Sequence, residues 1–299
     1  MTDLYTFSFD ALGTECLLHL YADSAEIANA TAEAAMGEVY RIECRYSRYR
    51  EDSVLSSINR AAASGTPVVA DEETAALLDY AFAAYHISDG LFDITSGILR
   101  RAWDFNTSRP PERTEVATLL PAIGMNKLQW VSPQLRFLKP GLELDFGGIG
   151  KEYAADRVAA VCQANGIVAG LVDLGGDILA LGPHPDGAPW RIGIRNPRSP
   201  TEAIAVMELS AGALATSGDY ERYIDFEGKR YCHILNPRTG WPVDGLSSVS
   251  VQAEQCLLAG SLATITMLKG ESGKAWLTDL GIRHCWVDST GQLGGTLIA

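Results

Sequence analysis

The chain has 299 residues and a net charge of −13 at pH 7, from 37 acidic and 24 basic side chains. This excess of acid excludes a general nucleic-acid-binding protein, because the phosphates of DNA and RNA need a basic surface. Hydrophobic residues make up 47% of the chain, enough for a large core in one domain or two. The six cysteines show no C-x-x-C spacing, and no apolar run reaches the ~20 residues of a membrane-spanning helix. We therefore expect a cytoplasmic protein with reduced thiols.

The chain begins with a pattern typical of a strand pair. Alternating apolar residues predict strands at 5–9 and 16–21, joined by a short turn. Asp23 or Ser24 then caps a long helix, which ends near Tyr46.

Helices dominate the next part of the chain. A short helix is expected at 54–59, and a longer one begins after Asp71 and stops near 89–90. The polar segment 106–113 holds two prolines and is the best candidate for a linker. Thr114 is expected to cap a short helix that follows it.

The second half of the chain alternates between hairpins and helices. Its expected elements are strands at 127–131, 135–138 and 142–146, a helix at 151–164, mainly antiparallel strands over 167–251, helices at 254–269 and 272–280, and two final strands. Hairpins and helices with few βαβ units indicate an α+β fold, with antiparallel sheet and packed helices.

The glycine-rich segment 144–151 is the first candidate for a binding site. Asp145 ends an expected strand, three glycines follow, and Lys151 opens a helix. Glycines let a ligand approach the backbone, and free amides at a helix start suit an anion. The spacing matches neither a Walker A loop nor a Rossmann fingerprint, since Asp145 and Tyr153 stand where those motifs need glycine. A tight turn that binds nothing explains the segment equally well.

Three other segments carry weaker signals. The glycine pair within 173–177 reads more readily as a bulge within or between strands than as a ligand contact. Asp93 or Thr95 reads as a helix cap, although a flat heterocycle could also bind there. His233 follows an amphipathic hairpin and precedes an Asn-Pro turn. Histidine titrates near neutral pH, so His233 is the best candidate for an acid–base group, although a structural histidine is the commoner case.

Several blocks together resemble the FAD:protein FMN transferase family of the ApbE type. They follow the order and spacing of that family over nearly the whole chain, at residues 11–14, 47–49, 52–53, 59, 90–95, 144–156, 174–177, 217–222 and 233–240. The resemblance implies an ApbE-like, T-fold-like architecture in a single domain over 1–299, in which two lobes could enclose FAD. It implies metal-dependent transfer of FMN from FAD to a threonine or serine hydroxyl of an acceptor protein, with release of AMP.

The resemblance also implies roles for particular residues. His233 would be the catalytic base. The FAD-binding residues would be Leu12, Tyr49, Leu91, Phe92, Asp93, Asp145, Lys151 and Leu235. Magnesium would lie at the backbone of Gly148 and at Thr264.

One position departs from the family pattern. The family typically carries an aspartate four residues before this threonine, and Gly260 stands there in this chain. A hard cation would lose one charged ligand, so magnesium is expected to be weakly held or absent. Two alternatives follow for the function: a protein that only binds FAD, and an FAD pyrophosphatase in which water replaces the acceptor hydroxyl.

Overall fold

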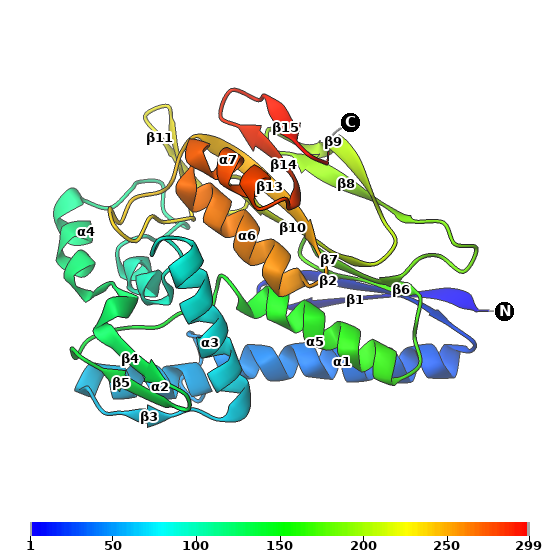
Figure 1. The fold of residues 1–299 in the computed structure, drawn as a ribbon, viewed down its shortest axis with the longest axis horizontal. Coiled ribbons are helices and arrows are strands. Elements are labelled where there is room, and N and C mark those ends of the chain that lie inside the picture. Colours follow the sequence, from blue (N-terminus) through cyan, green and yellow to red (C-terminus); the bar gives the residue numbers. More distant parts are fainter. Residues whose placement is uncertain (1, 298–299) are drawn as a thin grey trace.

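The computed structural model describes residues 2–297; Met1 and the last two residues of the expected 1–299 domain lie outside the described part. Its centre is an eight-stranded antiparallel sheet with helices on one face (Figure 1), which confirms the expected α+β class. In spatial order the strands are β1 (Asp3–Ala11), β2 (Thr14–Ala22), β6 (Gly170–Leu174), β7 (Asp177–Gly182), β10 (Gly212–Gly218), β13 (Leu246–Ala253), β14 (Arg283–Asp288) and β15 (Leu293–Gly295).

Two tight turns at the same end of this sheet set the register of its hairpins. In the first, Ala11 pairs with Thr14, so that Leu12 and Gly13 alone connect β1 to β2. In the second, Leu174 pairs with Asp177, and the glycine pair between them has φ of 66° and 91°. Only glycine adopts such angles without strain, so the glycines of 173–177 form a turn between strands.

Four helices cover one face of the sheet: α1 (Ala25–Tyr46), α5 (Gly150–Ala164), α6 (Cys256–Lys269) and α7 (Glu271–Asp279). Helix α1 packs on α5, α5 on α6, and α6 on β10 and β13. Helix α6 is buried along most of its length because it lies between α5 and the sheet. Ser24 is the N-cap of α1, since its side chain accepts from the amide of Ile27 at 3.3 Å.

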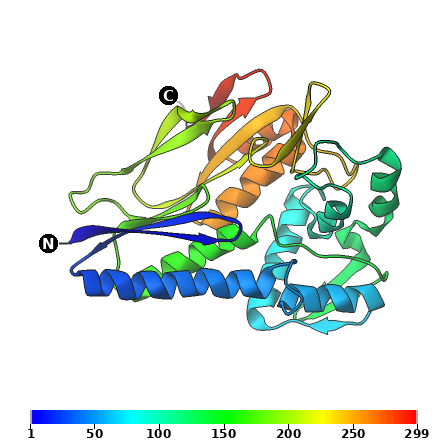
Figure 2. The ribbon, with the colours of Figure 1, turned by 180° about the vertical axis from the view of Figure 1, so that it is seen from behind.

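A separate two-stranded ribbon covers the opposite face of the sheet (Figures 1 and 2). It consists of β8 (Trp190–Asn196) and β9 (Ser199–Leu209). Its apolar side chains Trp190, Ile192 and Leu209 form a second core with Leu171 and Leu214 of the sheet. The middle of the sheet is therefore buried on both faces.

The segment between α1 and α5 forms a smaller region at one end of the sheet, on the left of Figure 1. Its helices are α2 (Val54–Ser64), α3 (Glu72–Ile87), the 3₁₀ helix η1 (Ile94–Arg101), α4 (Arg113–Leu119), and the single turns η2 (Leu120–Ala122) and η3 (Met125–Lys127). Its small sheet has the order β3 (Val68–Val69), β5 (Gln134–Phe137), β4 (Leu128–Val131).

The expected strand at 142–146 is wrong. The segment is irregular because its backbone bonds to neighbours other than a strand. The amide of Leu144 donates to Asn59 Oδ1 at 2.7 Å, and its carbonyl accepts from Asn59 Nδ2 at 2.9 Å. The amide of Asp145 donates to the carbonyl of Ile94 at 2.8 Å. These bonds tie the glycine-rich segment to α2 and η1.

Two helix boundaries also differ from expectation. The helix expected at 54–59 continues to Ser64 and ends at Gly65, whose φ is 72°. Thr114 lies inside α4, whose N-cap is Glu112 in a capping box with Glu115.

Among residues 2–297, no helix combines the length and the apolarity needed to cross a membrane. All six cysteines are free thiols, as expected.

Candidate functional site

His233 directly follows the hairpin of β11 (Tyr223–Phe226) and β12 (Lys229–Cys232), and its amide donates to the carbonyl of Arg222 at 3.0 Å. Its Nδ1 is buried and has no hydrogen-bond partner among the described residues. Burial, followed by the charges of Arg100 and Arg222, lowers the pKa of His233 to about 4. His233 is thus a neutral imidazole at pH 7, the protonation state that a general base requires.

Three arginines from distant segments, Arg48, Arg100 and Arg222, form a basic cluster, of which Arg100 and Arg222 lie near His233. Arg100 Nη2 lies 3.5 Å from the carbonyl oxygen of His233, and Arg222 Nη2 lies 3.4 Å from the Cβ position at Gly13. Burial is the main cause that lowers the pKa of Arg100, and Arg222 and Arg48 lower it further. A buried cation destabilised in this way, as Arg100 is, favours a bound anion, even in a chain of net charge −13.

Asp145 holds one member of this cluster in place. Arg48 Nη1 donates to Asp145 Oδ2 at 2.9 Å and to the carbonyl of Gly97 at 2.7 Å. The other oxygen, Asp145 Oδ1, accepts from the amide of Gly147 at 2.8 Å. Arg48 also pairs with Glu143. The carboxylate of Asp145 therefore joins the guanidinium of Arg48 to the glycine turn.

We expect Gly97→Ala to disturb this arrangement. A Cβ at Gly97 would collide with the side chain of Asp145 and lie 3.0 Å from Arg48 Nη1. Overpacking of this kind costs about 1–3 kcal/mol, measurable by urea unfolding. The control is Gly37→Ala on α1, where a Cβ meets nothing within 4 Å and where alanine should add about 0.5–1 kcal/mol of stability. Equal effects of the two substitutions would contradict the prediction.

Lys151, in the first turn of α5, reaches the turn between β6 and β7. Its Nζ lies 2.8 Å from Asp177 Oδ2 and 3.4 Å from the carbonyl oxygen of Gly175. Asp177 is only 2% exposed. Burial lowers the pKa of Lys151, but Asp177 and Glu152 outweigh it and hold the pKa above its usual value. The lysine is therefore charged and fixed by a buried partner.

Phe92 and Gly148 are brought together by the fold. The Cβ position at Gly148 lies 3.2 Å from Phe92 Cζ, so a larger residue at 148 would have to displace the ring. Phe92 is buried, and the neighbouring Leu91 is partly buried against the main core. The side chains of Leu91 and Phe92 therefore form an apolar surface beside the glycine turn.

Asp93 acts as a cap through its carboxylate. Oδ1 accepts from the amide of Thr95 at 2.8 Å and from its hydroxyl at 2.6 Å, while Oδ2 accepts from the amide of Met125 at 3.1 Å. With both oxygens engaged, the side chain has a structural role in the start of η1. If this segment contacts a ligand, the contact would therefore be made by its backbone atoms.

Leu12, Tyr49 and Leu235 lie on loops. Leu12 has a φ of 56°, unusual for a branched side chain, and its amide donates to Glu43 Oε1 at 3.0 Å. Tyr49 is 82% exposed, so its ring is free to contact a flat partner. Leu235 is partly buried and forms a bridge with Pro242 just after His233.

Thr264 lies on α6, where its Oγ1 is 2.8 Å from Ser217 Oγ of β10. Gly260 lies one turn earlier on the same helix, and the space at its Cβ is occupied by the side chain of Glu152. No group of three histidine, cysteine or acidic side chains arranged for a metal occurs among residues 2–297. A cation here would therefore rely on hydroxyl and backbone oxygens together with few carboxylates.

Sequence reasoning missed the basic cluster, Asp177 and Glu152 as parts of this site. Arg48 and Arg222 lie inside the segments that carried the family resemblance, which was a usable signal. Asp177 and Glu152 also lie inside such segments, at 174–177 and 144–156, whereas nothing in the local sequence marks Arg100, which only the packing of separate elements brings to the site.

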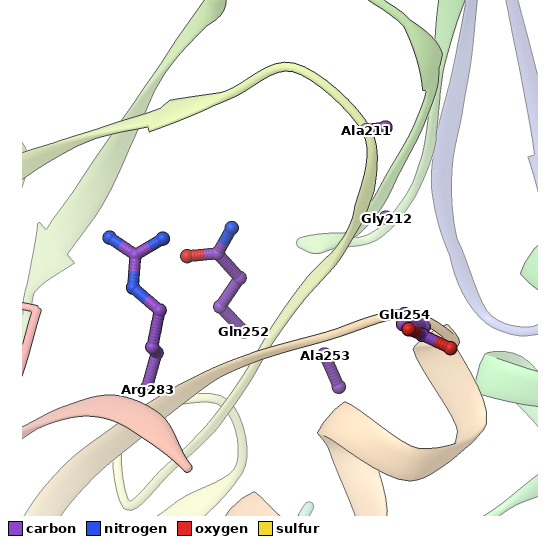
Figure 3. A pocket seen from close by; sticks show the side chains of 6 residues that line it. All are labelled: Ala211, Gly212, Gln252, Ala253, Glu254 and Arg283. Carbon is purple, nitrogen blue, oxygen red and sulfur yellow. The ribbon is translucent and has the colours of Figure 1, made fainter.

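A shallow hollow of 370 Å³ lies elsewhere, where the turn before β10 meets the end of β13 (Figure 3). Among the residues that line it, Arg283 and Gln252 extend side by side from neighbouring strands, and Glu254 points away from them (Figure 3). None of the side chains singled out above lines it.

Known proteins match the whole of this architecture. A family model described as the ApbE family matches residues 12–286. The FAD:protein FMN transferase of Vibrio cholerae serotype O1 is 34% identical over 231 residues, which cover 75% of this chain and 69% of that protein. A crystal structure of an ApbE protein from Thermotoga maritima matches with a TM-score of 0.90 and 31% identity, covering 98% of this chain and 97% of that one. The flavin transferase ApbE from Vibrio cholerae matches with a TM-score of 0.86 and 28% identity, over 99% and 98% of the two chains.

Proposed function

The chain belongs to the ApbE family, and from this we propose that it transfers FMN from FAD to a threonine or serine hydroxyl of an acceptor protein. The hydroxyl oxygen would attack the phosphorus of the FMN half, the bond to the bridging oxygen would break, and AMP would leave. Two relatives of similar length carry the corresponding names, FAD:protein FMN transferase and flavin transferase.

The observation that carries this proposal is the neutral imidazole of His233 inside a basic cluster. A hydroxyl must lose its proton as it attacks, and the unpartnered Nδ1 of His233 is a buried acceptor for that proton. Arg100 and Arg222 would bind the pyrophosphate and stabilise the charge that develops on it. Burial, and next the charges of the same two arginines, lower the pKa of His233 and so keep the imidazole unprotonated.

We place the FAD between the sheet and the smaller region. Leu12 comes from the β1–β2 turn, whereas Tyr49 and Phe92 come from the smaller region. The exposed ring of Tyr49 offers a stacking surface for the isoalloxazine. Lys151 and Asp145 would lie near the phosphates, the first as a charge and the second by orienting Arg48.

A divalent cation would fit beside the glycine turn. The backbone of Gly148 and the hydroxyl of Thr264 would hold it, and magnesium would supply further neutralisation of the pyrophosphate. The unpartnered buried oxygen of Glu152 is the feature of this structure that agrees with a cation there.

The direct test is incubation with FAD, magnesium and an acceptor domain that has an exposed threonine. Transfer should add FMN covalently to the acceptor, seen by mass spectrometry, with one AMP released for each FMN attached. Free FMN and AMP without a modified acceptor would indicate a pyrophosphatase instead. Bound FAD that remains intact would indicate binding alone.

We expect an unusual pH dependence of this reaction. The pH profile of kcat/KM reports the pKa of the free enzyme's base, and for His233 that pKa is lowered to about 4. The active, neutral form then predominates above this value, so kcat/KM for FAD should stay flat from about pH 8 to about pH 5.5 and fall only below. Bound phosphates would offset the two arginines, so kcat should fall at a higher pH than kcat/KM. An inflection of kcat/KM near the usual histidine value of about 6.5 would contradict this.

A further inference from the structure

Helices α5 and α6 meet at Gly260, and an acidic side chain fills the space that a larger residue there would need. The Cβ position at Gly260 lies 2.5 Å from Glu152 Cγ and 2.9 Å from Glu152 Oε1. Any side chain at 260 would therefore collide with Glu152. The side chain of Glu152 therefore fills the space beside α6 that a side chain at 260 would enter.

The burial of this carboxylate without a partner destabilises the folded protein. Glu152 is only 7% exposed, and its Oε2 has no hydrogen-bond partner among the described residues. The nearby ammonium group of Lys151 is already paired with Asp177 at 2.8 Å. Burial, and next the charge of Asp177, raise the pKa of Glu152 to about 7. A buried carboxylate without a charge partner is rare and requires a compensating proton or cation.

The surroundings of Glu152 suit a cation better than a proton alone. Glu152 comes four residues after Gly148, and the residue that it touches, Gly260, lies one helical turn before Thr264. Residues four apart share a helix face, so Thr264 and its partner Ser217 lie on the side of α6 that faces Glu152. The hydroxyl of the adjacent Ser261 is also buried and unpartnered. Carboxylate, hydroxyl and carbonyl oxygens are the ligands of a hard divalent cation.

We propose that Glu152 supplies from α5 the cation-binding carboxylate that this chain lacks at position 260 of α6. The cation is a hard divalent ion such as Mg²⁺ or Mn²⁺. The glycine at 260 then does not abolish the cation site, because it leaves space for the side chain of Glu152, which supplies the carboxylate instead. This inference rests on the proposed function for its purpose, yet cation binding can be measured without FAD or an acceptor.

The test is calorimetric titration of the FAD-free protein with Mn²⁺, together with the Mn²⁺-induced rise in Tm. Glu152→Gln keeps the shape of the side chain and removes its charge, and we expect it to weaken Mn²⁺ binding at least tenfold and to abolish the rise in Tm. The control is Glu202→Gln on the exposed ribbon strand β9, which should bind as the wild type does. Unchanged binding in Glu152→Gln, or no Mn²⁺ binding by the wild type, would overturn the proposal.

An exchange of the two residues provides a second, independent test. Gly260→Asp alone should lower Tm, because the new side chain collides with Glu152. Adding Glu152→Gly removes the collision, and we expect the double variant to recover both Tm and Mn²⁺ affinity. If the double variant folds but does not bind Mn²⁺, a carboxylate at 260 cannot replace the one at 152, and the proposal is refuted. Mn²⁺ binding that depends on Glu152 in a protein that transfers no FMN would uphold this inference and refute the proposed function.

Discussion

Replacing His233 with alanine should lower the rate of FMN transfer by a factor of about 10² to 10⁴, the usual contribution of a general base. The substitution removes the unpartnered Nδ1 that would accept the proton of the acceptor hydroxyl. It leaves the basic cluster in place, so the affinity for FAD should change little. Single-turnover formation of the FMN–acceptor adduct, followed by mass spectrometry, measures the first effect, and flavin fluorescence measures the second.

The matched control is His86→Ala, at an exposed position on α3. It should transfer FMN at the wild-type rate, because His86 lies on an outer surface and no contact links it to the basic cluster. If His233→Ala transfers FMN at the wild-type rate, His233 is not the base, whatever the effect of the substitution on stability.

Lys151→Met should destabilise the protein, by up to about 3 kcal/mol, because it leaves the buried carboxylate of Asp177 without its half-buried partner. The charge left without a partner is that of Asp177. Its carboxylate is 2% exposed and lies 2.8 Å from Lys151 Nζ in the unsubstituted protein. The carboxylate of Glu152 would add repulsion, since the charge of Asp177 already raises the pKa of Glu152. Urea unfolding at pH 7.5 measures the free energy of unfolding.

A second substitution separates the two roles of the lysine. Lys151→Met with Asp177→Asn removes the stranded charge and should recover most of the lost stability. Its FAD affinity should remain low if Lys151 acts on the phosphates. A double variant as unstable as Lys151→Met would show that the cost comes from packing and not from the unpaired carboxylate.

The sequence predicts well those helices and strands that are determined by residues within the element itself or next to it. Helix α1 follows from its cap at Ser24 and its apolar spacing, and the first hairpin follows from alternation around a two-residue turn. The expected strand at 142–146 failed because its backbone bonds go to Asn59, 85 residues away in the chain. No local pattern records such a partner.

The same distinction applies to the site. His233 and Lys151 could be singled out from a hairpin end and a helix start, and in the structure both have charged neighbours that shift their pKa. The basic cluster could not be assembled from sequence, because its arginines come from a loop, a 3₁₀ helix and a hairpin. Gly260 could be recognised as a departure from a family pattern, but its meaning depends on Glu152, 108 positions earlier in the chain.

The close packing of Glu152 against Gly260 also constrains how this chain can change over evolutionary time. An aspartate at position 260 would be strained while Glu152 remains, because its Cβ would lie 2.5 Å from Glu152 Cγ. A small residue at 152 would relieve this collision, but a chain that carried it together with Gly260 would have neither carboxylate. Substitutions at the two positions are therefore coupled, and each single change is expected to cost either stability or a carboxylate.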